Sequence, residues 1–368
     1  METVGLSTLF GAGYGGLRVL VTGHTGFKGS WLALWLHAMG ARVAGLALAP
    51  ERTPSHWEQL GLALELDARV DLRDRQGVAE VLAAFRPELV FHLAAQSLVR
   101  RSYREPAATF AINVGGLVNL YEAVRGCDSV RAVVNVTTDK VYQACSQPRS
   151  YREDDPLGGH DPYSTSKACA ELISASYRLS CFDHDDGRGD RVRLATARAG
   201  NVVGGGDWAE DRLVPDLVRA VLSASPLVLR NPRATRPWQH VLEPLSGYLM
   251  LGAALLRAEP VDEAWNFGPA PDATMEVGEL VRRMQQYWRG LEVAHDPGPH
   301  PHEAAQLSLN CDKAMQRLGW QPLWNADTTL RRTIEWYRAL DRDGVLYTTH
   351  DLRAYIDDAR RAERVWAT

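Results

Sequence analysis

The stretch RVLVTGHTGFKGSW, Arg18–Trp31, joins a short apolar run to the start of a helical pattern through three glycines. Gly23, Gly26 and Gly29 fall between the two, where glycine permits a tight turn and lets the backbone approach a pyrophosphate. The free N–H groups and the dipole of the helix that follows favour an anion at the same place. This placement predicts a dinucleotide-binding βαβ unit.

Beyond this stretch, short apolar runs alternate with longer helical patterns, which indicates βαβ units around a parallel sheet. We expect strands in RVLVTG, ARVAGLAL, ARVDL, ELVFHLAA, VRAVVNVTT and VRLATARAGNVV. We expect helices at Gln76–Phe85, Ala107–Arg125 and Tyr163–Leu179, and one more in SWLALWLHAMG with an apolar stripe of Trp31, Leu34, Trp35 and Ala38. The predicted fold class is α/β, a Rossmann-type doubly wound parallel sheet of at least six strands followed by a smaller C-terminal substrate-binding α/β domain.

The composition is typical of a globular enzyme. Of 368 residues, 45% are hydrophobic and 23% charged. The net charge of −4 comes without a basic run, and no stretch of about 18 apolar residues occurs, so we expect neither a nucleic-acid nor a membrane partner. Five cysteines without paired spacing fit a reducing compartment, and we expect a cytoplasmic protein.

No metal site is expected. The stretch DHDDGRGD at 183–190 resembles the start of a calcium loop, but Leu194 stands at the last ligand position. The stretch HEAAQ at 302–306 begins like a zinc-protease helix, yet Gln306 stands where the second histidine is required.

Lysine is rare in this chain. Of 41 basic residues only four are lysines, namely Lys28, Lys140, Lys167 and Lys313. A guanidinium does not deprotonate near neutral pH, so each position that keeps lysine is a candidate for proton transfer or for a compact charge. Chance retention is the alternative.

The stretch DPYSTSKACAEL places Tyr163 and Lys167 four residues apart, on one face of a helix. An ammonium beneath a phenol favours the phenolate and lowers the pKa of the tyrosine. Tyr163 could then take a hydroxyl proton while hydride leaves the same carbon. This spacing often arises by chance, but its place after a dinucleotide fold favours the functional interpretation.

In VVNVTTDKVYQ, Val133–Gln143, an apolar strand ends in two threonines and is followed by an acid beside an amine, Asp139 and Lys140. Ligands of doubly wound sheets bind at the carboxyl ends of the strands, where this pair falls. We therefore expect the pair in the active site. A solvent-exposed salt bridge at the strand end is the alternative.

The glycine loop, HLAAQ, NVTTDKVY, the Tyr-Lys pair and ARAGNVVGGGDW together resemble the extended short-chain dehydrogenase/reductase family, whose members act on nucleotide sugars. Longer stretches resemble its CDP-glucose 4,6-dehydratase branch from about Leu17 to at least Trp336: GHTGFKGSWLALWL, DPYSTSKACAEL, AGNVVGGGDWAEDRLVPDLVRA, RPWQHVLEPLSGYL and WNFGP. The resemblance implies NAD as cofactor and the conversion of CDP-glucose to CDP-4-dehydro-6-deoxyglucose and water in deoxysugar biosynthesis. A dehydratase or 4-epimerase of another nucleotide sugar, and a catalytically idle NAD-binding regulator, are the alternatives.

The resemblance also implies the order of the chemistry. Hydride leaves C4 of the sugar for NAD, the resulting ketone acidifies the C5 proton, water departs from C5 and C6, and the hydride returns to C6. Thr138 would hold the C4 oxygen near Tyr163, and Asp139 would protonate the departing oxygen. Lys140 stands where the dTDP-glucose relatives carry a glutamate base. It could act as a neutral base, or as a cation that stabilises the enolate.

The cofactor-binding residues implied in the same way are Gly23, Gly26, Phe27, Lys28, Gly29, Asp71, Leu72, Ala94, Ala95, Tyr163 and Lys167. The acid usually found at the end of the second strand is missing, since GLALAPERT has its first carboxylate at Glu51, so this motif does not separate NAD from NADP. Asp71 could accept from the adenine amino group or be a surface turn residue. The implied substrate-binding residues are Gln96, Asn201, Arg212, Arg236 and His302, with Asn201 and Arg236 at the pyrophosphate.

The resemblance further predicts a domain division and an assembly. An NAD-binding Rossmann domain is expected at 15–200 plus about 236–265, and a nucleotide-sugar domain at 201–235 and 266–368. The helices Ala107–Arg125 and Tyr163–Leu179 would pair across a two-fold axis into a four-helix bundle, so we expect a homodimer.

Overall fold

The structure is a computed structural model that describes residues 6–145, 149–182, 192–270, 273–288, 291–296, 298 and 307–368. The stretches at 183–190 and 302–306, which resemble metal-binding motifs but are not expected to bind a metal, lie outside the described residues. The predicted substrate-binding residue His302 lies outside them as well. Within the described part, no helix is both long enough and apolar enough to cross a lipid bilayer.

A parallel seven-stranded sheet forms the centre of the fold, in the order β11-β6-β5-β4-β1-β2-β3. The predicted doubly wound sheet is therefore confirmed. All six predicted strands are present, although β3 begins two residues before the predicted segment, and β11 adds a seventh strand. The strands are β1 (Arg18–Thr22), β2 (Arg42–Ala47), β3 (Leu66–Arg69), β4 (Leu89–His92), β5 (Ala132–Val136), β6 (Arg193–Ala199) and β11 (Ala264–Phe267).

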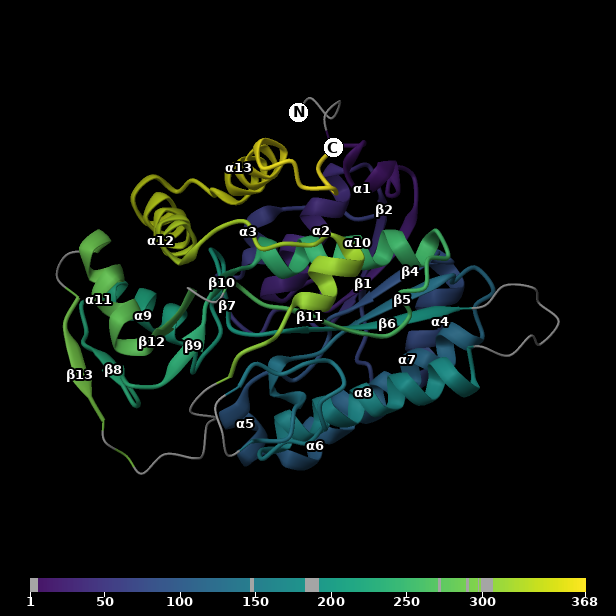
Figure 1. Cartoon of the computed structure of the whole chain (residues 1–368), viewed down its shortest axis with the longest axis horizontal. Coiled ribbons are helices and arrows are strands. Elements are labelled where there is room, and N and C mark those ends of the chain that lie inside the picture. The colour runs from purple at the N-terminus through teal and green to yellow at the C-terminus, as the bar shows by residue number, and fades with distance from the viewer. Residues whose placement is uncertain are drawn as a thin grey trace.

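Both faces of the sheet are covered, because successive side chains of a strand point to opposite faces. Val19 and Val21 of β1 pack in the core on the side of α2 (Phe27–Ala38) and α10 (Leu242–Leu256). Leu20 packs in a second core on the side of α4 (Arg75–Phe85) and α7 (Gly116–Arg125). Figure 1 shows the two helical layers above and below the sheet, with α8 (Pro162–Ser180) in the lower layer.

The three helices predicted by residue range are confirmed, and their ends have local causes. The range Ala107–Arg125 is a continuous helical segment made of α6 (Pro106–Phe110), a π-helical turn η1 (Ala111–Gly115) and α7. At the start of α8, the Asp161 carboxylate accepts from Ser164 N at 2.9 Å, and Pro162 occupies the first turn. A carboxylate cap and an early proline both favour a helix start at this point, which fixes Tyr163 in the first turn.

The apolar stripe predicted for α2 is buried, but it is only part of the buried surface of this helix. Leu32 and Leu36 are as fully buried as Trp31 and Trp35, so nearly every face of the helix is covered. The cover comes from segments at opposite ends of the described chain. Phe10 of α1 (Leu9–Ala12) stacks on Trp366 with ring centroids 5.1 Å apart, and both rings contact Trp35.

The second half of the chain contributes three small two-stranded pairings beside the large sheet. They join β7 (Val202–Val203) to β10 (Gln239–His240), β9 (Thr235–Pro237) to β12 (Thr274–Glu276), and β8 (Leu227–Leu229) to β13 (Val293–His295). Figure 1 places the last two pairs with α9 and α11 at one end of the molecule. The predicted division into two domains stays a prediction. The remaining helices are α3 (His56–Leu60), α5 (Val99–Arg104), α9 (Leu213–Leu222), α11 (Val277–Tyr287), α12 (Ala326–Asp343) and α13 (Thr348–Arg361), with short turns η2 (Asp139–Val141) and η4 (Ala314–Leu318).

Candidate active site

The glycine loop between β1 and α2 has no room for side chains at two of its positions. Gly23 has φ +75°, and a Cβ atom there would lie 2.7 Å from the backbone nitrogen of Ala94. A Cβ atom on Gly29 would lie 2.1 Å from the carbonyl oxygen of Gly23. Gly26 is the N-cap of α2, and no side chain caps this helix end. The loop therefore presents bare backbone at a helix N-terminus, which fits the pyrophosphate of a dinucleotide.

The other predicted cofactor-binding residues lie at the carboxyl ends of β1, β3 and β4. Phe27 and Lys28 form the first turn of α2, Ala94 and Ala95 follow β4, and Asp71 and Leu72 follow β3. Asp71 accepts from both the backbone and the guanidinium of Arg73, which lowers the pKa of this carboxyl group. That arrangement matches the surface-turn alternative. A contact between Asp71 and adenine stays a prediction.

Lys28 lies deeper in the site than its place in the glycine loop indicates. Its Nζ is 3.5 Å from the Tyr248 hydroxyl of α10. Burial, followed by the charge of Arg212, lowers the pKa of Lys28 to about 7; Lys167 and Lys140 act in the same direction, while Asp139 opposes them. The charges of two further lysines, Lys140 and Lys167, thus reach Lys28.

Tyr163 and Lys167 occupy the first two turns of α8, and both are buried. Lys167 Nζ donates to the carbonyl oxygen of Val136, the last residue of β5, at 3.0 Å. Burial raises the pKa of Tyr163 to about 12, and a hydrogen bond with Thr138 and the charge of Arg212 oppose it. The expected lowering of this pKa below its ordinary value is not seen in the described residues. Burial lowers the pKa of Lys167 to about 8, against the charge of Glu171.

The predicted acid and amine form an ion pair at the end of β5. Lys140 Nζ and Thr138 Oγ1 both donate to Asp139 Oδ1, at 3.0 and 3.1 Å. The Asp139 side chain is 1% exposed and that of Lys140 is 24% exposed, so the pair is not the fully solvent-exposed salt bridge of the alternative. Asp139 Oδ2 is buried without a hydrogen-bond partner among the described residues. It faces Gly200, where a Cβ atom would lie 2.9 Å away.

Two of the predicted substrate-binding residues, Asn201 and Arg212, have polar groups that fit a part in this site. Asn201 follows β6 and Gly200, and its Nδ2 is buried without a partner in the part of the chain that the structure describes. Arg212 donates to Asp207 Oδ2 at 3.1 Å and to Ser97 Oγ at 3.0 Å. Because the charge of Arg212 reaches both Tyr163 and Lys28, this guanidinium belongs to the same site.

The side chains of two other predicted substrate-binding residues, Gln96 and Arg236, bind groups of the protein itself. The Gln96 side chain already has partners in its own loop and in α6: Oε1 accepts from Leu98 N at 2.6 Å, and Nε2 donates to Thr109 Oγ1 at 2.9 Å. Arg236 lies on β9 and donates to the carbonyl oxygen of Thr235 at 3.0 Å. The roles of Gln96 and Arg236 stay predictions.

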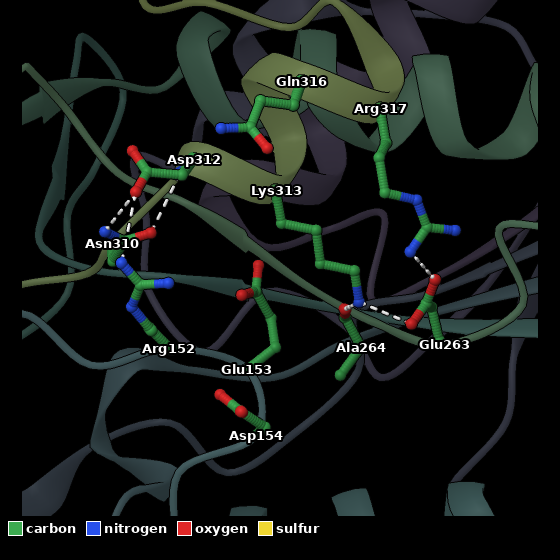
Figure 2. Close-up of a pocket in the computed structure, with 10 residues that line it drawn as sticks. All are labelled: Arg152, Glu153, Asp154, Glu263, Ala264, Asn310, Asp312, Lys313, Gln316 and Arg317. Carbon is green, nitrogen blue, oxygen red and sulfur yellow. Dashed lines mark hydrogen bonds and ion pairs between the residues drawn. The ribbon is translucent and has the colours of Figure 1, made fainter.

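A surface pocket of about 620 Å³ lies elsewhere, along β11 at the edge of the sheet, and contains none of the predicted site residues. Figure 2 shows the fourth lysine, Lys313, donating to Glu263 and to the carbonyl oxygen of Ala264, while Arg317 pairs with Glu263. These cations are already bound by the protein. The pocket therefore has no evident part in the chemistry of the site.

Sequence reasoning missed two buried residues of the site, Tyr248 and Glu171. Tyr248 reaches the site from α10, which no local spacing could reveal. Glu171 carried a signal, since it lies four residues after Lys167 and thus on the same face of α8.

The chain is similar to known proteins over most of its length. The sequence model of the GDP-mannose 4,6 dehydratase family matches residues 20–333. A CDP-glucose 4,6-dehydratase from Salmonella typhimurium is 44% identical over 352 residues, which are 94% of this chain and 98% of that protein.

Two solved structures share the fold. A dTDP-glucose 4,6-dehydratase from Streptomyces venezuelae, solved with NAD and TYD bound, is 26% identical over 89% of this chain and 98% of that one, with a TM-score of 0.73. A UDP-glucose 4-epimerase from Thermus thermophilus in complex with NAD is 27% identical over 88% and 99%, with a TM-score of 0.74. The chain therefore belongs to the GDP-mannose 4,6 dehydratase family, among the Rossmann-fold epimerases and dehydratases of nucleotide sugars.

Proposed function

We propose that the protein is a CDP-glucose 4,6-dehydratase, which converts CDP-D-glucose to CDP-4-dehydro-6-deoxy-D-glucose and water in deoxysugar biosynthesis. The observation that carries the proposal is the Asp139–Lys140 pair, beside the Tyr163 phenol and near Lys167. A 4-epimerase needs the tyrosine and lysine but has no water to eliminate. The identity of 44% to a dehydratase of CDP-glucose supports the choice of substrate.

NAD, when bound, would accept a hydride from C4 of the sugar and return it to C6. The glycine loop fits such a group, because its close backbone contacts at Gly23 and Gly29 leave bare peptide groups at the start of α2. The two solved relatives with NAD in their structures support the same cofactor here.

Tyr163 would take the proton of the C4 hydroxyl, with Thr138 holding the same oxygen. A phenol whose pKa is about 12 is protonated at neutral pH, so its phenolate needs stabilisation during the reaction. Arg212 already lowers this pKa, and the ammonium of Lys167 lies one helical turn further along α8. Positive charge around the phenol therefore favours the proton transfer.

The elimination step needs a base at C5 and an acid for the C6 hydroxyl. If a proton passes from Lys140 Nζ to Asp139 Oδ1 along their 3.0 Å hydrogen bond, one transfer produces both the neutral amine and the carboxylic acid. The amine then takes the C5 proton, and the acid gives its proton to the C6 hydroxyl, which leaves as water. The pair is then ionic again. When the hydride returns to C6, C5 must regain a proton, which the Lys140 ammonium can give, and the proton held by Tyr163 then restores the starting protonation of the site.

A homodimer is part of the proposal. Leu172 and Leu179 of α8 have exposed fractions of 60% and 69%, the highest among the large hydrophobic side chains of the described residues. Their spacing of seven residues places them on one face of the helix. A second copy of α8 would cover this face in a four-helix bundle with α7. We also propose a cytoplasmic location, because all five cysteines are free.

The test is to incubate the protein and NAD separately with CDP-, dTDP-, GDP- and UDP-glucose and to measure product mass. We expect efficient loss of water from CDP-glucose alone. Faster loss from dTDP-glucose under matched conditions would reassign the substrate. A change of sugar configuration without loss of mass would identify a 4-epimerase instead.

A further inference from the structure

The carboxylate of Glu171 joins three elements below the site. It is buried on α8, one turn beyond Lys167. Its Oε1 accepts from Thr137 Oγ1 at 2.5 Å, and its Oε2 accepts from Thr196 Oγ1 at 2.6 Å and from Arg198 Nη2 at 2.9 Å. Thr137 directly precedes the segment Thr138–Lys140, which is called the acid-base segment below, whereas Thr196 and Arg198 belong to β6.

Arg198 extends this connection to the other side of the acid-base segment. Its Nη1 donates to the Tyr142 hydroxyl at 2.8 Å and to the carbonyl oxygen of Glu153 at 3.0 Å. The Tyr142 hydroxyl in turn donates to Asn266 Oδ1 at 2.6 Å. The Glu171–Arg198 ion pair therefore holds the residue before Thr138 and the second residue after Lys140.

We propose that the buried Glu171–Arg198 ion pair positions Asp139 and Lys140 for the water-loss step, with the Thr137 hydroxyl as the link. The inference rests on the proposed function and adds a positioning role to it. Glu171 contacts neither the predicted acid nor the predicted base. It acts by binding Thr137, directly after β5, and Thr196 on β6, and so holds the ends of the two neighbouring strands together.

The physical reason is that one site performs two steps with different geometric demands. The backbone of Tyr163 is fixed by the Asp161 cap at the start of α8 and not by Thr137, although its hydroxyl also meets Thr138. The positions of Asp139 and Lys140, in contrast, depend on how the end of β5 is held. Loosening Thr137 would move this pair relative to the sugar while Tyr163 stays in place, and a displacement of 1 Å can cost about 10²-fold in rate.

Replacement of Glu171 itself is a poor test, because an unpaired buried Arg198 would destabilise the fold. Two matched substitutions avoid this problem. Thr137→Val removes the hydroxyl on the side of the acid-base segment, and Thr196→Val removes the hydroxyl on the side of β6. Both threonines bind the same carboxylate, and both variants leave the ion pair intact. Thr137→Ser keeps the hydroxyl and serves as the rescue.

The measurements are the formation of reduced cofactor on rapid mixing with NAD and CDP-glucose, the exchange of the C5 proton in heavy water, and the loss of water by mass. We expect Thr137→Val to lose about 10- to 100-fold in C5 exchange and water loss, with formation of reduced cofactor within about 3-fold of the wild type. Thr137→Ser and Thr196→Val should stay close to the wild type in all three.

Equal slowing of both steps in Thr137→Val, or equal effects of the two valine variants, would overturn the positioning role. Thermal unfolding of each variant shows whether a general loss of structure is the cause of such a result. Unchanged water loss in Thr137→Val beside an active wild type would refute the inference alone. Absence of water loss in the wild type would refute the proposed function as well.

Discussion

Replacement of Lys140 by methionine separates the two halves of the proposed reaction. Methionine keeps an unbranched apolar side chain but removes the amine that donates to Asp139 at 3.0 Å. The first oxidation depends on Tyr163 and Lys167 and should survive. C5 proton abstraction and water loss should fail, so reduced cofactor and a 4-keto sugar nucleotide should accumulate.

Two free energies decide the outcome for Lys140→Met: the loss of unfolding free energy and the rise in the activation barrier of the elimination. Two charges 3.0 Å apart attract by about 5 kcal/mol at an effective dielectric constant of about 20. Lys140 is 24% exposed and the lost attraction is partly offset by its desolvation, so we expect a net loss of about 1–3 kcal/mol in unfolding free energy. Domains are stable by about 5–15 kcal/mol, and the variant should fold. Loss of a general base costs about 10²- to 10⁴-fold, or about 3–5 kcal/mol of barrier.

The assay follows reduced cofactor by absorbance, C5 exchange in heavy water and water loss by mass. Lys313→Met is the matched control, because Lys313 also forms an ion pair, with Glu263 at 2.6 Å, and its side chain is 19% exposed. The control should retain all three activities. Lys140→Arg keeps a charge that cannot act as a base near neutral pH, so substantial water loss by this variant would favour enolate stabilisation. Normal exchange and water loss in Lys140→Met would refute both roles for the residue.

Three further predictions concern other parts of the molecule. Tyr163→Phe should lower the rate of cofactor reduction by at least about 10²-fold with little change in NAD affinity by titration, and a wild-type rate would place the base elsewhere. Gly29→Ala should weaken NAD binding by more than about 10-fold, since its Cβ would lie 2.1 Å from Gly23 O, whereas Gly15→Ala, with no atom within 4 Å, should bind normally. Burial lowers the pKa of His56 to about 3, so below about pH 6.5 only the unfolded state binds the extra proton, and the unfolding free energy decreases as the pH is lowered. Between about pH 6 and pH 4, denaturant titrations should show that His56→Gln loses about 1.4 kcal/mol less of this free energy per pH unit than the wild type. Parallel curves for the two proteins would contradict this.

The sequence was sufficient to predict the architecture because most of its strands are continuous apolar runs between turn residues. It misplaced the start of β3 because apolar and charged residues alternate from Leu64 to Leu72, beyond both ends of this half-buried edge strand, so the pattern does not mark where the strand begins. It did not predict β11, since AWNF is short and contains a polar asparagine. The stripe predicted for α2 is buried, but the sequence did not reveal that Phe10 and Trp366, far away in the sequence, pack against Trp35.

The site was predictable where neighbours in the sequence are neighbours in space. Asp139 and Lys140 are adjacent, and Tyr163 and Lys167 share a helix, so both pairs could be found by spacing. The approach of Lys28 from α2 and of Tyr248 from α10 depends on how the two helices pack on the sheet. The raised pKa of Tyr163 was also missed, because desolvation depends on every neighbour of a group and not on one partner.

The scarcity of lysine makes the site accessible to a selective chemical label. The neutral amine of a lysine is the form that reacts with acylating and carbamylating reagents. The pKa values of Lys28 and Lys167, about 7 and about 8, give these two residues a larger neutral fraction near pH 7 than an ordinary lysine has. Lys313, the lysine far from the site, is held by Glu263. A small reagent such as cyanate should therefore modify Lys28 and Lys167 ahead of Lys313, and the sugar nucleotide should protect them. Peptide mass mapping could then report occupancy of the site without any turnover.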